Sequence, residues 1–287
     1  MNAQPTHQLV LTLDCEDQLG IVHAVAGFLV SHGCNIVDSQ QFDENGANRF
    51  FLRVQATYPA ATTIDALRAA FQATADAFAM CWSLAEAAER VRTLLMVSKA
   101  PHCMSDLLER WSNGQLPVEI PAIVSNHRDL EYIADRFAIP FVHIPVAPDT
   151  KAAAEQELLA LIDDQKIELV VLARYMQVLS DDLCSALPNR IINIHHSFLP
   201  GFKGSRPYHQ AHARGVKLVG ASAHYVTADL DEGPIIEQEV LRVDHRATPE
   251  DLVVAGREAE RAALARAVRW HAEHRVMING RRTVVFN

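Results

Sequence analysis

The chain has 287 residues, of which 49% are hydrophobic and 21% are charged, so its composition is that of a globular protein and excludes extensive disorder. Its formal net charge of −9 argues against a basic face that binds nucleic-acid phosphates. The sequence has no apolar run near the roughly 20 residues that a bilayer requires, and its N-terminus does not read as a secretory signal. We therefore expect neither a nucleic-acid partner nor a membrane partner.

The cysteines are odd in number and scattered, and none forms a C-x-x-C pair: Cys15, Cys34, Cys81, Cys103 and Cys184. This usage argues against a disulfide framework and favours a reducing compartment, so we expect a cytoplasmic protein with mostly buried thiols. His209 and His212 are three residues apart, but the sequence places no third ligand near them. We expect no metal.

The first 86 residues alternate in the order βαββαβ, which is typical of a ferredoxin-like domain. Gly33 stands where a helix C-cap glycine belongs, and the ENGAN turn separates two strands of a hairpin. The predicted elements are a strand at 9–14, a helix at 17–33, strands at 35–44 and 49–58, a helix at 64–78 and a strand at 79–86.

From residue 93 onward, apolar strands alternate with helices, which predicts a doubly wound, mostly parallel sheet. The predicted strands lie at 93–99, 118–126, 140–146, 167–175, 190–200, 217–227 and 233–243, and the predicted helices at 102–116, 129–140, 152–165 and 249–274. The charged segment AEAAERVR is the predicted linker, so we expect an α/β protein with domains at 1–86 and 87–287. Neither a G-x-G-x-x-G after the first strand of this sheet nor a P-loop is present.

Three polar residues stand near the ends of predicted strands, where open α/β sheets bind ligands. Asn193 and His195 are two apart on a strand and so share a face, and Asp231 precedes a later strand. An amide, an imidazole and a carboxylate at one point suit acyl chemistry, because they can stabilise an oxyanion and move a proton. Taken singly, Asn193 also reads as a turn former and Asp231 as a helix cap.

Two motifs, NIHHSFLPGFKG (193–204) and ASAHYVTADLDEGPIIEQ (221–238), resemble those of the folate-dependent formyltransferase superfamily. The resemblance covers most of residues 93–287 and implies that Asn193, His195 and Asp231 are catalytic. LARYMQVLS (172–180) resembles the superfamily's folate-pocket segment. The folate-binding residues implied in this way are Tyr175, Met176, Gln177, Val178, Leu179 and Leu230.

Two further positions of the same region have two readings each. His196 replaces a proline of many transformylases, and either positions water or only fills the loop. Lys203 either attracts the folate glutamate tail or is solvated.

In the first 86 residues, CEDQLGIV and HGCNIVDSQQ resemble the ACT domain, a small regulatory fold that commonly binds an amino acid. The resemblance implies an effector site formed by Asp17, Gly20, Ile21, Asn35 and Ile36. Gly20 would let a carboxylate approach a helix N-terminus, and Asp17 would cap that helix. In the alternative reading, this module only joins subunits.

The order of the two domains resembles the family of formyltetrahydrofolate deformylases. The resemblance implies hydrolysis of 10-formyltetrahydrofolate to formate and tetrahydrofolate without a cofactor, with methionine or glycine as an effector, in a homo-oligomer. The alternatives are formyl transfer to an amine and a non-catalytic folate-binding regulator. SKAPHCMSDLL (98–108) has no glycine with which to cradle the phosphate of a nucleotide acceptor, which disfavours the first alternative.

Overall fold

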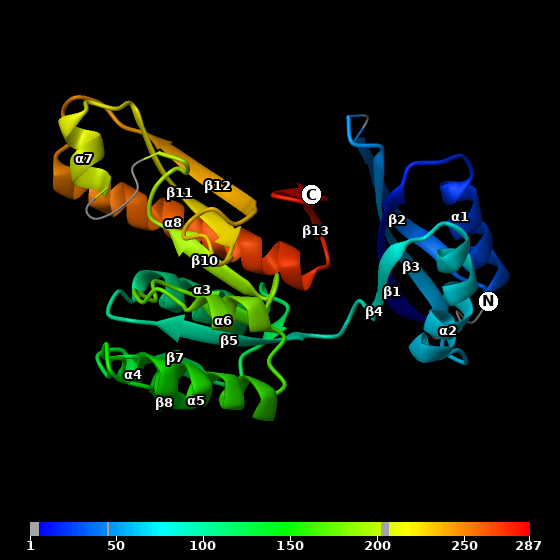
Figure 1. Cartoon of the computed structure of the whole chain (residues 1–287), viewed down its shortest axis with the longest axis horizontal. Helices are drawn as coiled ribbons and strands as arrows, with labels where there is room; N and C mark the ends of the chain where they lie inside the picture. The colour runs from blue at the N-terminus through cyan, green and yellow to red at the C-terminus, as the bar shows by residue number, and fades with distance from the viewer. Residues whose placement is uncertain (1–5, 45, 202–206) are drawn as a thin grey trace. The chain divides into compact units, whose positions relative to one another are not determined.

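The computed structural model describes residues 6–44, 46–201 and 207–287 (Figure 1). Contacts divide the chain into two compact units, one formed by residues 1–89, 273–277 and 284–287, the other by 90–272 and 278–283. The sequence did not indicate that C-terminal residues group with the first unit. The domain boundary expected between residues 86 and 87 stays a prediction, and Lys203 lies outside the described residues.

The first unit is a four-stranded antiparallel sheet in the order β2-β3-β1-β4. Both helices lie on one side of this sheet (Figure 1), and the side chains between the helices and the sheet form the core of this unit. The predicted ferredoxin-like order is confirmed. Its elements are β1 (Thr6–Glu16), α1 (Ile21–Ser31), β2 (Asn35–Glu44), β3 (Arg49–Pro59), α2 (Ile64–Ala77) and β4 (Cys81–Glu86).

Helix α1 begins later than the sequence predicts. Gly20 occupies the N-cap with φ 101°, a left-handed conformation that glycine adopts without strain. Asp17 is exposed and makes no side-chain cap, and its backbone N–H donates to the carbonyl of Asn48 at 3.1 Å. The predicted capping role of Asp17 is wrong, because the helix starts at Ile21 and Asp17 belongs to the turn before it.

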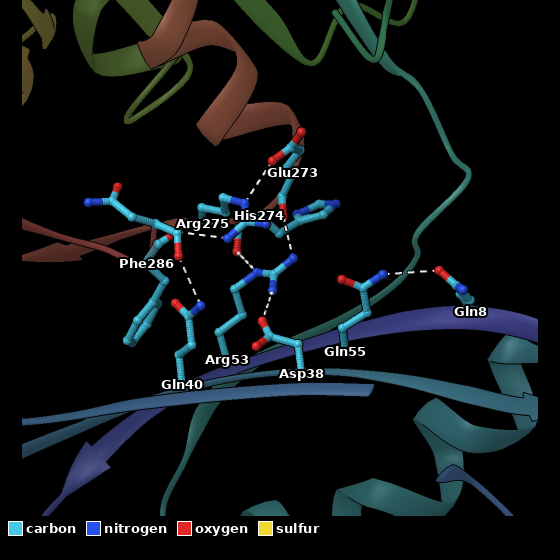
Figure 2. A network of polar contacts seen from close by, with 10 residues as sticks. Gln8, Asp38, Gln40, Arg53, Gln55, Glu273, His274, Arg275 and Phe286 are labelled. Carbon is cyan, nitrogen blue, oxygen red and sulfur yellow. Dashed lines mark hydrogen bonds and ion pairs between the residues drawn. The ribbon is translucent and has the colours of Figure 1, made fainter. Parts of the chain in front are cut away.

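The face of this sheet opposite the helices carries a buried cation. Arg53, on β3, is 2% exposed and donates to the backbone carbonyls of Glu273 at 3.1 Å and His274 at 3.2 Å. Its Nη1 lies 3.3 Å from Asp38 Oδ2. Gln40 donates to the main-chain oxygen of Asn287 at 2.9 Å (Figure 2). C-terminal backbone therefore supplies the acceptors that make a buried arginine tolerable on this face.

The second unit is built on one large sheet with helices on both faces. Its elements are β5 (Val91–Val97), α3 (His102–Ser112), β6 (Val118–Glu119), β7 (Ile123–Ser125), α4 (Glu131–Arg136), β8 (Phe141–His143), α5 (Lys151–Asp164), β9 (Leu169–Leu172), α6 (Asp181–Ala186), β10 (Ile191–His195), α7 (Pro207–Ala213), β11 (Leu218–Tyr225), β12 (Ile235–Arg242) and α8 (Pro249–Ala272). Near the C-terminus, β13 (Val276–Asn279) pairs with β14 (Arg282–Val285).

The large sheet runs β12-β11-β10-β9-β5-β7-β8, with β6 also paired to β5. Strands β10, β9, β5, β7 and β8 are parallel to one another, and β11 and β12 extend the sheet from β10 as antiparallel strands. The predicted doubly wound, mostly parallel sheet is confirmed. The chain moves outward from β5 in both directions, so the carboxyl ends of β5 and β9 meet at a topological switch point.

Alternate residues of the central strands face different helix layers. Leu94, Met96, Val170 and Leu172 pack in one core with Leu158 of α5. Helix α8 runs along β10, β11 and β12 (Figure 1). The predicted strand at 118–126 is wrong: β6 and β7 are separate pieces, because Pro121 between them cannot donate to a ladder. None of the helices in the described ranges is long and apolar enough to span a membrane.

Candidate active site

A cavity of about 290 Å³ opens where β9 and β10 end, close to the switch point of the sheet. The three predicted catalytic residues and all six predicted folate-binding residues line it. Its full lining is Leu172, Arg174, Tyr175, Met176, Gln177, Val178, Leu179, Asn193, Ile194, His195, His196, His224, Val226, Thr227, Leu230 and Asp231. Segments far apart in the sequence therefore converge on one cavity.

Asn193 is oriented by a neighbour on the adjacent strand. The β10–β11 register sets Asn193 opposite His224, and Asn193 Nδ2 lies 3.2 Å from His224 Nε2. His224 Nδ1 lies 2.8 Å from the carbonyl of Tyr225, so Nδ1 carries the proton and Nε2 accepts from Asn193. Burial lowers the pKa of His224, which keeps this ring neutral. The amide of Asn193 thus keeps a second N–H for another acceptor.

His195 and Asp231 form a second polar pair in the cavity lining. His195 Nδ1 lies 3.2 Å from Asp231 Oδ1, and this hydrogen bond is the main cause of the lowered pKa of Asp231. Asp231 therefore stays ionised and holds the Nδ1 proton. The opposite ring nitrogen, Nε2, is buried and makes no hydrogen bond within the described part of the chain. It is free to exchange a proton with a ligand in the cavity.

The loop that carries Asp231 is fixed by close backbone contacts. Asp231 adopts φ 57°, a left-handed conformation that Asp and Asn tolerate better than other non-glycine residues. At Gly233, a Cβ would meet the carbonyl oxygen of Tyr225 at 1.8 Å, so no other residue fits. The N–H of Tyr225 in turn donates to the carbonyl of Pro234 at 2.9 Å. These contacts return the chain toward β11 and place the carboxylate beside His195.

The turn after β10 is held by side chains of the two antiparallel strands. Ser222 Oγ accepts from the N–H of Leu199 at 3.0 Å, and Gln238 donates to the carbonyl of Leu199 at 3.0 Å. Ser197 donates to the carbonyl of Gly201 at 2.8 Å. Ser197 and Gln238 of the sequence motifs therefore stabilise the loop next to His195 and do not line the cavity.

One wall of the cavity is apolar and exposed. Met176, Val178 and Leu230 are 57%, 59% and 63% exposed, which is unusual for large apolar side chains. Ser98 Oγ accepts from the N–H of Met176 at 3.0 Å and so fixes this segment to the end of β5. Burial raises the pKa of Tyr175 to about 12, so its ring stays neutral. This wall suits a flat, largely apolar ligand.

Arg174 of the cavity lining also belongs to a buried ionic cluster that the sequence motifs do not predict. Glu260 of α8 is 2% exposed, and its carboxylate lies 2.8 Å from His102 Nε2, 3.1 Å from Tyr208 Oη and 3.4 Å from Arg174 Nε. Of the cluster's members, the sequence motifs contain Arg174, within the folate-pocket segment 172–180, and His102, within the segment 98–108. Glu260 carried no signal, because it lies on an amphipathic helix far along the chain.

Two groups of residues carry side chains that can ligate a metal ion. His102, Cys103 and Glu260 offer atoms within 4.8 Å of one another. Burial raises the pKa of the Cys103 thiol well above its usual range, and the Arg174 cation already pairs with Glu260, so this environment does not suit a metal ion. His209 and His212 are exposed on α7. The expectation of no metal stays a prediction.

The predicted effector residues lie at the start of α1 and of β2 in the first unit. Ile21 is 2% exposed and packs in the core of this unit, so it contributes to folding. Asp17, Asn35 and Ile36 are exposed, and Gly20 forms the helix N-terminus. These residues therefore lie at the starts of two consecutive elements, α1 and β2, and their binding of an effector stays a prediction.

Comparison with protein families divides the chain in the predicted order. Residues 7–83 match the model of the ACT domain, and residues 91–268 match the model of the formyl transferases. The crystal structure of glycinamide ribonucleotide transformylase 1 from Symbiobacterium toebii is similar to 69% of this chain and 95% of its own, with a TM-score of 0.64 and 32% identity. That similarity leaves nearly a third of this chain unmatched.

Formyltetrahydrofolate deformylases match nearly the whole chain. The relative from Corynebacterium sp. (strain P-1) is 54% identical over 99% of both chains. The relative from Escherichia coli (strain K12) is 40% identical over 96% of this chain and 97% of its own. The crystal structure from Burkholderia mallei ATCC 23344 has a TM-score of 0.94 and 52% identity, covering 98% of this chain and all of that one. The chain therefore belongs to the formyltetrahydrofolate deformylase family.

Proposed function

We propose that this chain hydrolyses 10-formyltetrahydrofolate to formate and tetrahydrofolate, with the chemistry at Asn193, His195 and Asp231. The observation that carries the proposal is the convergence of these three side chains on a cavity with one apolar wall. The flat pterin fits that wall, at residues 175–179 and Leu230, and the formyl group reaches the polar end. Hydrolysis of an amide changes no oxidation state, so the proposed reaction needs no redox cofactor.

The bond changes follow from the hydrogen bonds of the three residues. Water attacks the formyl carbon while His195 Nε2 accepts one of its protons, and Asp231 stabilises the resulting imidazolium. The free N–H of Asn193 donates to the oxyanion of the tetrahedral intermediate. His195 returns the proton to N10 as the C–N10 bond breaks. The formic acid left behind loses its own proton and leaves as formate.

The test is turnover of purified full-length protein with 10-formyltetrahydrofolate and no added acceptor, following formate and tetrahydrofolate. We expect both products to appear in equal amounts. Asp231→Asn keeps the left-handed backbone but removes the charge, so kcat falls by about 10²-fold or more. Asp229→Asn is the matched control, because Asp229 is exposed in the same loop and does not line the cavity. Near-normal turnover of Asp231→Asn would rule out this mechanism.

We also propose that the ACT domain binds a small amino acid, methionine or glycine, near Gly20 and Asn35, and that the protein works in the cytoplasm. The N-terminus of α1 and the absence of a side-chain cap there support an amino-acid carboxylate. All five thiols are unpaired, as a reducing compartment requires. Calorimetry with each amino acid tests binding. No heat, together with unchanged kinetics, would leave subunit association as the role of this domain.

We further propose that the protein is a homo-oligomer joined through the ACT sheets. Strand β2 is at the edge of its sheet and exposes Ile36, Val37 and Phe42. An exposed apolar edge strand is a template for pairing with a second copy. Sedimentation of the full chain measures this directly, and Val37→Lys on the edge strand should shift the population toward monomer. A wild-type monomer at all concentrations would contradict the proposal.

A further inference from the structure

Arg174 lines the catalytic cavity, and the proposed chemistry does not use it. Arg174 follows β9 directly, and its backbone adopts φ 68°, which is unfavourable for an arginine. Two backbone hydrogen bonds hold this conformation. The N–H of Ala173 donates to the carbonyl of Met96 in β5 at 2.8 Å, and the N–H of Ser98, just after β5, donates to the carbonyl of Arg174 at 3.2 Å. The strain is thus locked in beside the site.

The hydrogen-bonding capacity of Arg174 is almost unused. A guanidinium has five N–H donors, yet this one donates no hydrogen bond to any side chain or carbonyl in the described ranges. Its Nε is buried and unsatisfied, and its charge partner is Glu260 at 3.4 Å. Its side chain is 16% exposed. A buried donor set left open at a cavity is what an anionic ligand requires.

Glu260 holds the cation without saturating it. Burial alone would raise the pKa of Glu260, but the hydrogen bond from His102 and the charge of Arg174 lower it overall, so the carboxylate is ionised. Tyr208 and His102 occupy both of its oxygens, at 3.1 Å and 2.8 Å. Arg174 is therefore held by the charge of Glu260, while its Nε makes no hydrogen bond within the described ranges and its residue lines the cavity.

The neighbour of Arg174 on the cavity wall adds no competing charge. Burial, together with the charge of Arg174, lowers the pKa of His196 to about 4, so this ring is neutral at pH 7. His195, the last residue of β10, pairs with Asp231. Arg174 is thus the fixed cation of this wall among the described lining residues, next to the groups that act on the formyl carbon.

Hydrolysis creates an anion that the substrate lacks at this position. The formyl amide is neutral, whereas formate is a planar carboxylate with one negative charge. A guanidinium fork matches a planar carboxylate with two parallel N–H···O hydrogen bonds. We propose that Arg174 forms a formate-binding subsite in the catalytic cavity, which receives the product after the C–N10 bond has broken. This inference rests on the proposed hydrolysis.

The experiment measures inhibition by added sodium formate, with sodium chloride at the same ionic strength as the reference. Formate inhibits the wild type, and ¹³C-formate shows line broadening that depends on the protein. In Arg174→Met the inhibition constant for formate rises by at least about tenfold, while KM for the folate changes by less than about threefold. Arg174→Lys keeps the charge without the fork and gives an intermediate constant.

Two further variants separate binding from folding. Arg174→Met with Glu260→Gln removes both charges, so it avoids an unpaired buried carboxylate, and it should also fail to bind formate. Arg261→Met is the control. It removes a cation of α8, the helix that carries Glu260, and Arg261 does not line the cavity, so this variant should bind formate like the wild type.

The possible results are distinct. Wild-type turnover without formate inhibition, or equal inhibition constants in Arg174→Met and the wild type, would overturn the subsite. A parallel rise of KM and the inhibition constant would indicate a structural role only. A wild type that does not hydrolyse the folate would instead contradict the proposed function.

Discussion

His224 is a buried residue that orients the amide of Asn193, the proposed oxyanion donor. Its Nδ1 is committed to a backbone carbonyl, so its Nε2 must accept from Asn193. Without this acceptor the amide of Asn193 could rotate and present its oxygen to the substrate oxyanion. The tautomer of a single neutral histidine therefore determines whether Asn193 stabilises or opposes the developing charge.

We expect His224→Leu to lower kcat by about 10- to 100-fold, less than loss of the Asn193 donor itself, with KM for the folate nearly unchanged. Steady-state kinetics measures both constants. His271→Leu is the control, because His271 contacts Tyr225 Oη at 2.7 Å from helix α8 and does not line the cavity. A His224→Leu enzyme with normal kcat would show that Asn193 is oriented by other means.

At the scale of elements, two glycines inside helices predict opposite effects of the same substitution. In α8, a Cβ at Gly256 would lie 2.0 Å from Cζ of Tyr208, whose hydroxyl donates to Glu260 one turn later. In α1, a Cβ at Gly27 would meet no atom within 4 Å. Gly256 lets α8 and the ring of Tyr208 approach closely. Gly27 has no such contact and only increases the backbone entropy of the unfolded chain.

Gly256→Ala should destabilise the protein by about 1–3 kcal/mol, because the ring of Tyr208 must move. Gly27→Ala should stabilise it by about 0.5–1 kcal/mol. Urea denaturation of both variants beside the wild type gives the two free energies of unfolding. Equal shifts in the same direction would contradict the difference in packing.

At the scale of the whole molecule, the acceptors of Arg53 suggest how the C-terminus is retained. Arg53→Met removes the guanidinium that donates hydrogen bonds to the carbonyls of Glu273 and His274. The segment after α8 should therefore detach from the sheet that carries Arg53 more often. We expect faster tryptic cleavage after Arg275, followed by mass spectrometry. Gln55→Ala is the control, because Gln55 bonds Gln8 on the same sheet and not the C-terminus (Figure 2). Unchanged cleavage in Arg53→Met would show that other contacts retain the segment.

Stability should also depend on pH through His196. Its pKa is about 4 in the folded protein, against 6.5 for a solvated histidine, so between these values the unfolded chain binds the proton and the folded chain does not. Stability therefore falls as the pH decreases through this window, by about 2 kcal/mol between pH 7 and pH 5 from this residue. His196→Gln should remove that part of the slope in urea denaturation. The same pH dependence of the free energy of unfolding in His196→Gln and the wild type would contradict this prediction.

Local patterns in the sequence were sufficient for most of the fold and for the members of the cavity. The βαββαβ order, the alternation of strands and helices, and the segment 175–179 all depend on periodicity or on short motifs, which act over a few residues. Asn193 and His195 could be placed on one face from strand geometry alone. Asp17 was misassigned because a left-handed Gly20 moves the helix start, which composition does not reveal.

Other features were decided only by tertiary structure. The union of Arg174 with Glu260, the acceptors of Arg53 in the C-terminal backbone, and the hydrogen bond from Asn193 to His224 each join segments that no local pattern links. Which polar atom is left unsatisfied depends on the complete set of its neighbours, because burial and hydrogen bonding belong to the folded chain. The sequence by itself thus determined the family, most of the elements and the residues proposed to react. Packing determined the tautomers and charges of these residues and left the Arg174 Nε beside them without a hydrogen bond.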